Sequence, residues 1–356
     1  MRLVRSLWSL SGQAAFKKQL YYCMLAQGFQ RKAWIEAWRS SNVWGLLLWQ
    51  LNEIWPTGGW GSLEYGTPVA GQVIGGRWKI LHNFLRQSSF VDVFVGCGVA
   101  TRSADAGVEV ANSSTVNAAN PLCFIRNDLP RAFAGELSAS VVAFATGKSV
   151  LLKQINISLG PGTSSLFCPD NGGLLGNHLP STAHCGTFGD LLASSGCEDA
   201  ASCYLNVKVV PAAATGSTGA TNAAVLYGHN DLLMAAPFQL KLPPVVLSVH
   251  VIVNASGEGT DAAAGGDDNG GGIHAAPDVH SDVTSVPVEI RTDRVGVAAY
   301  VWLTTRAAGR FEPNGFMMKK RAVTVQFIPF EQPPDLRLLN ASVRAEHLGG
   351  YLVSTG

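Results

Sequence analysis

The sequence has few charged residues and no long hydrophobic run. Only 14% of its 356 residues are charged, and the formal net charge is +1. Such a balance gives no electrostatic footprint for nucleic acid or for an anionic membrane surface. The longest apolar run, Val245 to Val253, is interrupted by Ser248 and His250, and a membrane-spanning helix needs about 20 apolar residues. We therefore predict no nucleic-acid partner and no membrane span.

The sequence also lacks the spacing of a metal site. Its seven cysteines include no Cys-x-x-Cys, and its eight histidines are scattered, so we expect no metal and no cofactor. Four cysteines crowd one loop-rich region: Cys168, Cys185, Cys197 and Cys203. Disulfides in an oxidising compartment are the favoured interpretation, and free core thiols are the alternative. The odd count leaves at least one thiol free, for which Cys23 is the obvious candidate.

The N-terminal part of the sequence has a helical pattern. Residues 14–39 predict a helix in which Phe16, Leu20 and Met24 recur at every fourth position and share one face. The run from Val43 to Trp49 is apolar without alternation, which is typical of a strand buried on both faces.

A second helix is predicted at Gly76 to Arg86. Helix, buried strand and helix form part of a parallel α/β architecture. A complete barrel takes about 250 residues, and fewer than 90 precede the next change of pattern. The unit is therefore either a fragment or a part that packs on another chain.

From Phe90 onward the pattern is that of β structure. Short apolar runs separated by glycine and proline predict strands near 91–95, 123–128, 137–144, 150–159, 203–210, 245–253, 295–304 and 323–330. We expect two β-sandwiches, at 90–242 and 243–348, with a boundary near Pro243 and Pro244. A Gly- and Asp-rich insertion at 257–281 is expected to be flexible and disordered from its composition. A calcium loop is the alternative, but the ligand spacing and the closing glutamate of that motif are missing.

Three ordered motifs carry a family resemblance. Trp49 to Pro56 reads Trp-Gln-Leu-Asn-Glu-Ile-Trp-Pro, Trp60 to Tyr65 reads Trp-Gly-Ser-Leu-Glu-Tyr, and Gly76 to His82 reads Gly-Arg-Trp-Lys-Ile-Leu-His. Together they resemble the end of the catalytic barrel in β-mannosidases of glycoside hydrolase family 2. Farther on, Glu312 to Phe316 is a degraded match to the Ser-Asp-Asn-x-Phe of the family's final immunoglobulin-like domain.

The resemblance implies a fold and a division into domains. Residues 1–89 would be the C-terminal end of a (β/α)8, or TIM, barrel. They would be followed by two immunoglobulin-like β-sandwich domains at 90–242 and 243–348. The start of the chain, basic but without an apolar core, does not have the pattern of a signal peptide. We expect it to lie inside a longer protein whose preceding segment supplies the rest of the barrel.

The two catalytic carboxylates of the family have no counterpart in this sequence. Retaining glycosidases use a nucleophile and an acid/base about 5–5.5 Å apart. In family 2 both residues precede the Trp-Gln-Leu-Asn segment, and no Ser-Glu-Phe/Tyr-Gly nucleophile motif occurs here. We therefore name no catalytic residue and expect the isolated chain to be inactive.

The resemblance also places candidate substrate-binding residues at the end of the eighth barrel strand: Trp49, Gln50, Asn52, Glu53, Trp55 and Trp60. Tryptophan offers an apolar face to a sugar ring, and amides can bind hydroxyls. For Trp49, a place in the sugar cleft and a place in the core are equally favoured. For Trp55 and Trp60, packing in the core or within the loop is favoured.

Two carboxylates near this segment have a structural interpretation beside the functional one. Glu53 could stand at the rim of a sugar pocket, but we favour a side chain that hydrogen-bonds the loop backbone and holds its shape. Glu64 is likewise expected to be structural. No feature beyond proximity in sequence supports these two as a new catalytic dyad.

The function implied by the resemblance is that of a retaining exo-β-mannosidase, represented by its C-terminal part. It would act on terminal β-D-mannose residues of an oligosaccharide or a glycoprotein glycan. A related family 2 specificity, for glucosamine or galactose, stays open. The alternative from another class is a non-catalytic carbohydrate-binding or interaction protein that retains only the sandwiches.

The expected location is the lysosome or the outside of the cell. Four Asn-x-Ser/Thr sequons support it as glycosylation candidates: Asn112, Asn156, Asn254 and Asn340.

Overall fold

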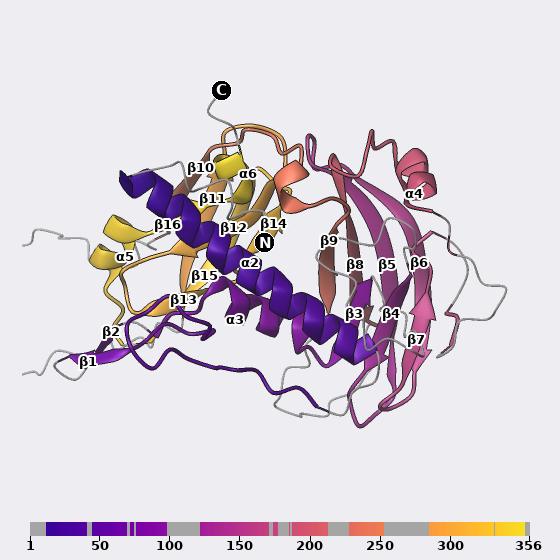
Figure 1. Cartoon of the computed structure of the whole chain (residues 1–356), viewed down its shortest axis with the longest axis horizontal. Coiled ribbons are helices and arrows are strands. Elements are labelled where there is room, and N and C mark those ends of the chain that lie inside the picture. Colours follow the sequence, from indigo (N-terminus) through magenta and orange to yellow (C-terminus); the bar gives the residue numbers. More distant parts are fainter. Residues whose placement is uncertain are drawn as a thin grey trace, which may run out of the picture.

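The computed structural model describes residues 12–40, 45–69, 72–74, 76–97, 122–170, 174–176, 185, 187–212, 228–252, 285–330 and 332–352. Two β-sandwiches lie side by side, and one long helix, drawn in indigo in Figure 1, runs across both. The described residues are mostly β-sheet with few helices, which confirms the β-rich part of the predicted fold. None of their helices has the length and hydropathy to cross a bilayer.

The first sandwich pairs a three-stranded sheet, β3-β4-β7, with a four-stranded sheet, β6-β5-β8-β9. All neighbouring strands are antiparallel. Their bounds are β3 Val93–Cys97, β4 Cys123–Asn127, β5 Phe133–Ala143, β6 Ser149–Leu159, β7 Ser164–Phe167, β8 Cys203–Pro211 and β9 His229–Leu233. Aliphatic side chains from both sheets, among them Val95, Leu137 and Leu205, form one shared core. A short helix, α4 (Phe188–Ser195), begins at a Thr187 capping box.

The second sandwich pairs β10-β11-β15-β13 with β14-β12-β16. The bounds are β10 Leu247–Val251, β11 Val286–Thr292, β12 Ala298–Thr304, β13 Gly309–Glu312, β14 Phe316–Met318, β15 Ala322–Pro329 and β16 Arg344–Glu346. Two short helices, α5 (Leu336–Ser342) and α6 (Leu348–Leu352), complete it. His250 on β10 is exposed, because alternate side chains of this strand face solvent.

The predicted N-terminal helix forms as α2 (Gly12–Ser40), but its predicted face is wrong. Phe16 and Leu20 are exposed, whereas Tyr21, Tyr22, Leu25 and Phe29 are buried. These side chains pack on the second sandwich at Tyr300 and Trp302 and on Phe84. At Gly28 an added Cβ would lie 3.0 Å from the ring of Phe84, so the close approach of the two helices suits glycine.

The strand predicted at 43–49 is wrong for the described residues of that run. Residues 45–50 are irregular, and the Leu47 side chain is 99% exposed. A strand buried on both faces needs hydrogen-bonding neighbours on both sides, and no described residue forms a ladder with this run. The predicted helix 76–86 begins later, as α3 (Ile80–Phe84), and continues as a π-helical turn, η1 (Leu85–Ser89).

The remaining short elements are a hairpin, β1 (Thr67–Val69) and β2 (Gln72–Ile74), and a 3-10 turn, η2 (Pro237–Gln239). The proline pair proposed as a boundary lies between η2 and β10, and that boundary stays a prediction. The insertion at 257–281 and the sequons Asn112 and Asn254 fall outside the described residues.

The disulfide prediction is confirmed. Three bridges join Cys97 to Cys123, Cys168 to Cys185, and Cys197 to Cys203. Cys23 is the free cysteine, and it is exposed on α2. All three bridges lie in the first sandwich and its adjoining loops.

Candidate functional site

The loop that carries the predicted sugar-binding residues is held by a buried carboxylate. Glu53 is 2% exposed. It pairs with the Lys79 ammonium, and its Oε1 accepts a hydrogen bond from Gly61 N at 2.9 Å. Lys79 Nζ also donates to the carbonyl oxygen of Gly59 at 3.2 Å. Glu53 therefore ties the two halves of the loop together, as the structural interpretation expected.

Backbone hydrogen bonds close the same loop. Ser62 N donates to Leu51 O at 2.9 Å, and Glu53 N donates to Leu63 O at 3.1 Å. A Cβ on Gly61 would come within 2.6 Å of the Asn52 carbonyl carbon, so only glycine fits where the two segments meet. Lys79 N donates to Ser62 O at 3.0 Å and joins the loop to the start of α3.

A histidine completes this anchor. The Ser62 hydroxyl donates to Leu51 O at 2.7 Å and lies 2.9 Å from His82 Nδ1. A hydroxyl has one proton, so His82 Nδ1–H must be the donor to Ser62 Oγ. Burial lowers the pKa of His82, and the nearby Arg310 and Arg86 lower it further. The imidazole is thus held neutral in the tautomer that this contact requires.

The anchored loop turns its tryptophans outward. Trp49, Trp55 and Trp60 are 72%, 57% and 56% exposed. None of them packs beneath the loop, so the packing favoured for Trp55 and Trp60 is wrong. Asn52 is also exposed and Gln50 is half-buried. Large apolar surface held out to solvent on a fixed backbone is typical of a binding surface.

One of these tryptophans lines a groove. An open groove of about 980 Å³ is lined by residues of the loop and of α2. Its lining includes Trp60, Pro56 and Tyr65 from the loop, Leu20 and Cys23 from α2, and Lys79. The structure does not bring Trp49, Gln50, Asn52 or Trp55 to this groove. Glu53 is not in the groove's lining, but it pairs with Lys79, which is. The six predicted residues therefore share one loop but not one cavity.

Arg77 and Trp78 connect the loop to the second sandwich. Arg77 Nε donates to Glu64 Oε2 at 2.9 Å, and Arg77 Nη1 donates to Thr305 O at 3.0 Å. The Arg310 guanidinium lies 4.6 Å from the centre of the Trp78 ring. Glu53 and Glu64 each hold a cation, so neither is a free carboxylate. Within the described residues no three His, Cys, Asp or Glu side chains gather to hold a metal.

The degraded motif before Phe316 has a structural role. Asn314 is buried, its Nδ2 donates to Leu303 O at 3.0 Å, and its Oδ1 accepts from Leu303 N at 2.8 Å. The Asn side chain thus satisfies both backbone groups of Leu303 on β12. Gly315 follows with φ +71°, where a glycine avoids backbone strain.

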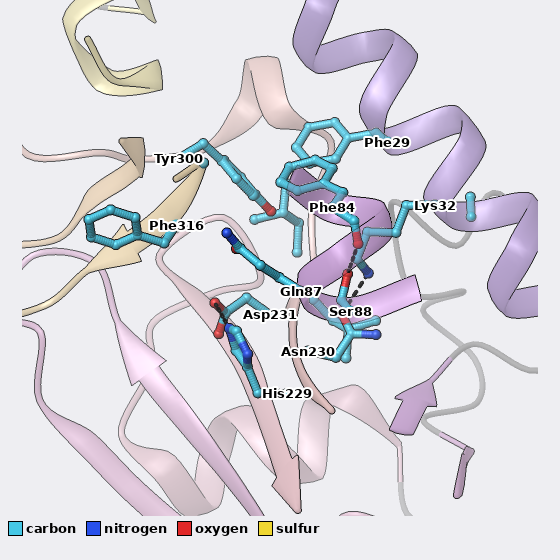
Figure 2. Close-up of a pocket in the computed structure, with 14 residues that line it drawn as sticks. Phe29, Lys32, Phe84, Gln87, Ser88, His229, Asn230, Asp231, Tyr300 and Phe316 are labelled. Atoms are coloured by element: carbon cyan, nitrogen blue, oxygen red, sulfur yellow. Dashed lines mark hydrogen bonds and ion pairs between the residues drawn. The ribbon is translucent and has the colours of Figure 1, made fainter. Parts of the chain in front are cut away.

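A second cavity, which sequence analysis missed, lies where α2, η1, β9 and β12 meet. Figure 2 shows its side chains, with Lys32, Gln87, Asp231 and Tyr300 among them. Its volume is about 40 Å³, which is room for little more than water. Burial, followed by the charges of Asp231 and Glu36, raises the pKa of Tyr300. The lining comes from six separate elements, α2, α3, η1, β9, β12 and β14, so no local pattern could have revealed it.

Beside this cavity, Lys32, Glu36 and Asn230 form a closed network. Lys32 pairs with Glu36, its Nζ donates to Asn230 Oδ1 at 2.6 Å, and Asn230 Nδ2 donates to Glu36 Oε1 at 2.8 Å. The network joins α2 to β9, so it positions the helix on the first sandwich.

Comparison with known proteins agrees with this architecture. Residues 275–350 match the Ig-fold domain family of mannosidases. The chain is similar to the C-terminal portion of β-mannosidase-like enzymes of glycoside hydrolase family 2, which confirms the resemblance seen in the sequence.

The individual relatives are β-mannosidases. That of Capra hircus is 37% identical over 81 residues, which are 20% of this chain and 8% of the relative. That of Mus musculus is 35% identical over 123 residues, 32% of this chain and 13% of the relative. The matches thus span a small fraction of each relative's length. The exo-chitosanase CsxA of Amycolatopsis orientalis aligns with 93% of this chain and 34% of its own, at 10% identity and a TM-score of 0.46.

Proposed function

We propose that this chain is the C-terminal part of a retaining exo-β-mannosidase that removes terminal β-D-mannose residues from glycans. Residues 45–65 would form one wall of its sugar cleft. The observation that carries the proposal is a loop fixed by the buried Glu53–Lys79 pair that presents three exposed tryptophans. A fixed loop binds without a large ordering cost, and indole faces suit the apolar faces of sugar rings.

The apolar run before the loop supports a place in a barrel. Leu47 is fully exposed, and each buried Å² of apolar surface gains about 25 cal/mol. We expect barrel strands from the preceding polypeptide to cover this run and to pair with it. The loop would then follow the carboxyl end of a barrel strand, where barrel active sites lie.

The reactive carboxylates are assigned to that preceding polypeptide. Hydrolysis with retention needs a nucleophile and an acid/base about 5–5.5 Å apart. Glu53 and Glu64 are ion-paired with Lys79 and Arg77, which does not suit either role. The chain alone is therefore expected to be inactive.

The test compares the isolated chain with the protein extended through its full transcript. Nitrophenyl β-mannoside should be turned over by the extended protein and not by the isolated chain. In the extended protein, Trp49→Ala and Trp60→Ala should lower kcat/KM by about tenfold or more, since each removes a stacking surface. Phe238→Ala, at an exposed aromatic of the 3-10 turn η2 outside the loop, is the matched control. Clear turnover by the isolated chain, or a substrate panel that prefers β-galactoside or β-glucosaminide, would contradict the proposal.

A non-catalytic carbohydrate-binding protein is the second candidate, because the exposed tryptophans would serve binding without catalysis. It predicts that the isolated chain binds mannobiose in calorimetry and that Trp60→Ala abolishes this binding. It also predicts an upstream reading frame without the two catalytic motifs. The presence of both motifs upstream would decide for the enzyme.

A lysosomal or secreted location is part of the proposal. Three disulfides are typical of an oxidising compartment. The described sequons Asn156, on β6, and Asn340, on α5, are both exposed. Endoglycosidase treatment of the protein from its native source should therefore reduce its mass, and an Asn156→Gln/Asn340→Gln variant should reduce that shift.

A further inference from the structure

A cavity rich in arginine lies between the anchored loop and the second sandwich. It has a volume of about 280 Å³. Five cationic side chains line it: Arg77, Lys79, Arg306, Arg310 and Arg344. Glu64 is the one carboxylate in its lining. In a chain of near-neutral net charge, this is a local excess of positive charge.

Two of the five cations are already committed. Lys79 pairs with Glu53, and Arg77 uses Nε for Glu64 and Nη1 for Thr305 O. Arg306 and Arg344 are exposed, and no described residue forms a hydrogen bond or an ion pair with either guanidinium. Arg310 stacks on Trp78 and reaches Glu312 Oε2 only at 3.5 Å. The guanidinium groups of Arg306 and Arg344 are therefore available to a ligand, and that of Arg310 is held only by the ring contact and this long ion pair.

Two buried N–H groups of the lining also lack acceptors. Trp302 is 4% exposed, and its Nε1–H has no partner within the described residues; the same holds for Arg310 Nε. A buried donor without a partner costs about 1–3 kcal/mol, so native structures rarely keep one. Both unpartnered groups are donors and both residues line the cavity, so an acceptor bound there is what could satisfy them.

We propose that this cavity binds an oxyanion, a phosphate, sulfate or carboxylate group, through Arg310, Arg344 and Trp302. Guanidinium groups bind such anions with two parallel charge-assisted hydrogen bonds, and an indole N–H can add a third contact. The cavity shares Met24, Glu64 and Lys79 with the groove that Trp60 lines. An anionic substituent of a sugar could therefore enter with its ring in that groove. The site is independent of the proposed hydrolysis.

Calorimetric titration of the purified chain tests the proposal. The probes are inorganic phosphate, glucose 6-phosphate and uncharged glucose, in Tris buffer at low ionic strength because exposed charges are screened by salt. Phosphate and glucose 6-phosphate should bind, and glucose alone should bind at least about tenfold more weakly. Equal affinities for the first two point to a free oxyanion as the source, whereas tighter binding of the sugar phosphate points to an anionic sugar.

Four variants assign the contacts. Arg344→Gln and Arg310→Gln should each weaken phosphate binding by about tenfold, since each removes a charge-assisted contact. Arg131→Gln changes an equally exposed arginine on the first sandwich and should bind as wild type does. Trp302→Phe keeps the ring system's apolar contact but removes the donor, and should weaken binding by about threefold.

Each outcome decides the matter. Arg344→Gln changes an exposed side chain that forms no hydrogen bond or ion pair with a described residue, so this variant should fold even if Arg310→Gln is destabilised. Loss of affinity in Arg344→Gln with none in Arg131→Gln supports the site. No measurable binding of either anion to the wild type, or equal weakening in both of these variants, overturns it. Unchanged affinity in Trp302→Phe removes the indole from the site.

Discussion

The apolar run at residues 45–49 and strand β5 of the first sandwich both carry leucine, but in opposite surroundings. Leu47 is 99% exposed and Leu137 of β5 is 0% exposed. β5 has β6 on one side and β8 on the other, whereas no described strand pairs with 45–49. The comparison teaches that an apolar run becomes a strand only where neighbours accept its backbone hydrogen bonds. The segment after this run keeps its shape by other means, through the Glu53–Lys79 pair.

The largest effect should come from breaking that pair. Lys79→Met leaves the Glu53 carboxylate buried without its cation and should cost about 3–5 kcal/mol of unfolding free energy, measured by urea denaturation. The control is Arg77→Gln, whose half-exposed pair with Glu64 is worth at most about 1 kcal/mol. The double variant Glu53→Gln/Lys79→Met should recover part of the loss. Equal losses of unfolding free energy in Lys79→Met and Arg77→Gln would show that the Glu53–Lys79 pair is not what holds the loop.

The two leucines test the comparison directly. Leu137→Ala should cost about 2–5 kcal/mol because it opens a cavity in the first core. Leu47→Ala should change the unfolding free energy by no more than about 0.5 kcal/mol, because the side chain contacts water. Urea denaturation of the isolated chain measures both. In the extended protein Leu47→Ala should lower the unfolding free energy substantially. An unchanged unfolding free energy there would argue against coverage of Leu47 by barrel strands.

The disulfides test how much of the first sandwich's stability comes from its cross-links. Replacing Cys97 and Cys123 by alanine opens a cross-link with a sequence separation of 26, which should cost about 3 kcal/mol. The pair Cys197 and Cys203, with a separation of 6, should cost about 2 kcal/mol. Thermal unfolding of the two double variants should rank them in that order. The reverse ranking would show that loop length does not govern their contributions.

The smallest effect should be a pH dependence in the second sandwich. Burial lowers the pKa of His347, although its hydrogen bond with Val245 O opposes the shift. Below an ordinary pKa of about 6.5, the unfolded chain binds a proton that the folded chain does not. Stability should therefore fall as the pH drops from 7.5 toward 5, by at most about 1.4 kcal/mol per pH unit for this residue. His347→Gln should reduce this slope, whereas His250→Gln, at an exposed position, should keep it.

The elements that could be predicted from the sequence are those that depend on the pattern of adjacent residues. The helix at 12–40 follows from its long helical stretch, and strands such as β5 and β8 follow from short apolar runs separated by glycine and proline. The buried face of α2 could not be predicted, because it depends on Tyr300 and Trp302, far along the chain. Strands β13, β14 and β16 are too short to give a periodic signal. They form because longer neighbours pair with them.

The candidate site divides in the same way. The motif around Trp49 could be recognised from adjacent residues, and the structural role of Glu53 was favoured from the sequence. Its partner Lys79 lies 26 residues away, so only the fold identifies the contact. The arginine cavity collects side chains from residues 24 to 344, and no sequence pattern unites them.

The free thiol on α2 has a practical consequence. All seven cysteines are described, and six of them are bridged, so a maleimide dye should label Cys23 alone. Its groove contains Trp60, and indoles quench many fluorophores at contact distance. A single attached dye would therefore report, by a change in brightness, whenever a sugar or another stretch of polypeptide enters that groove.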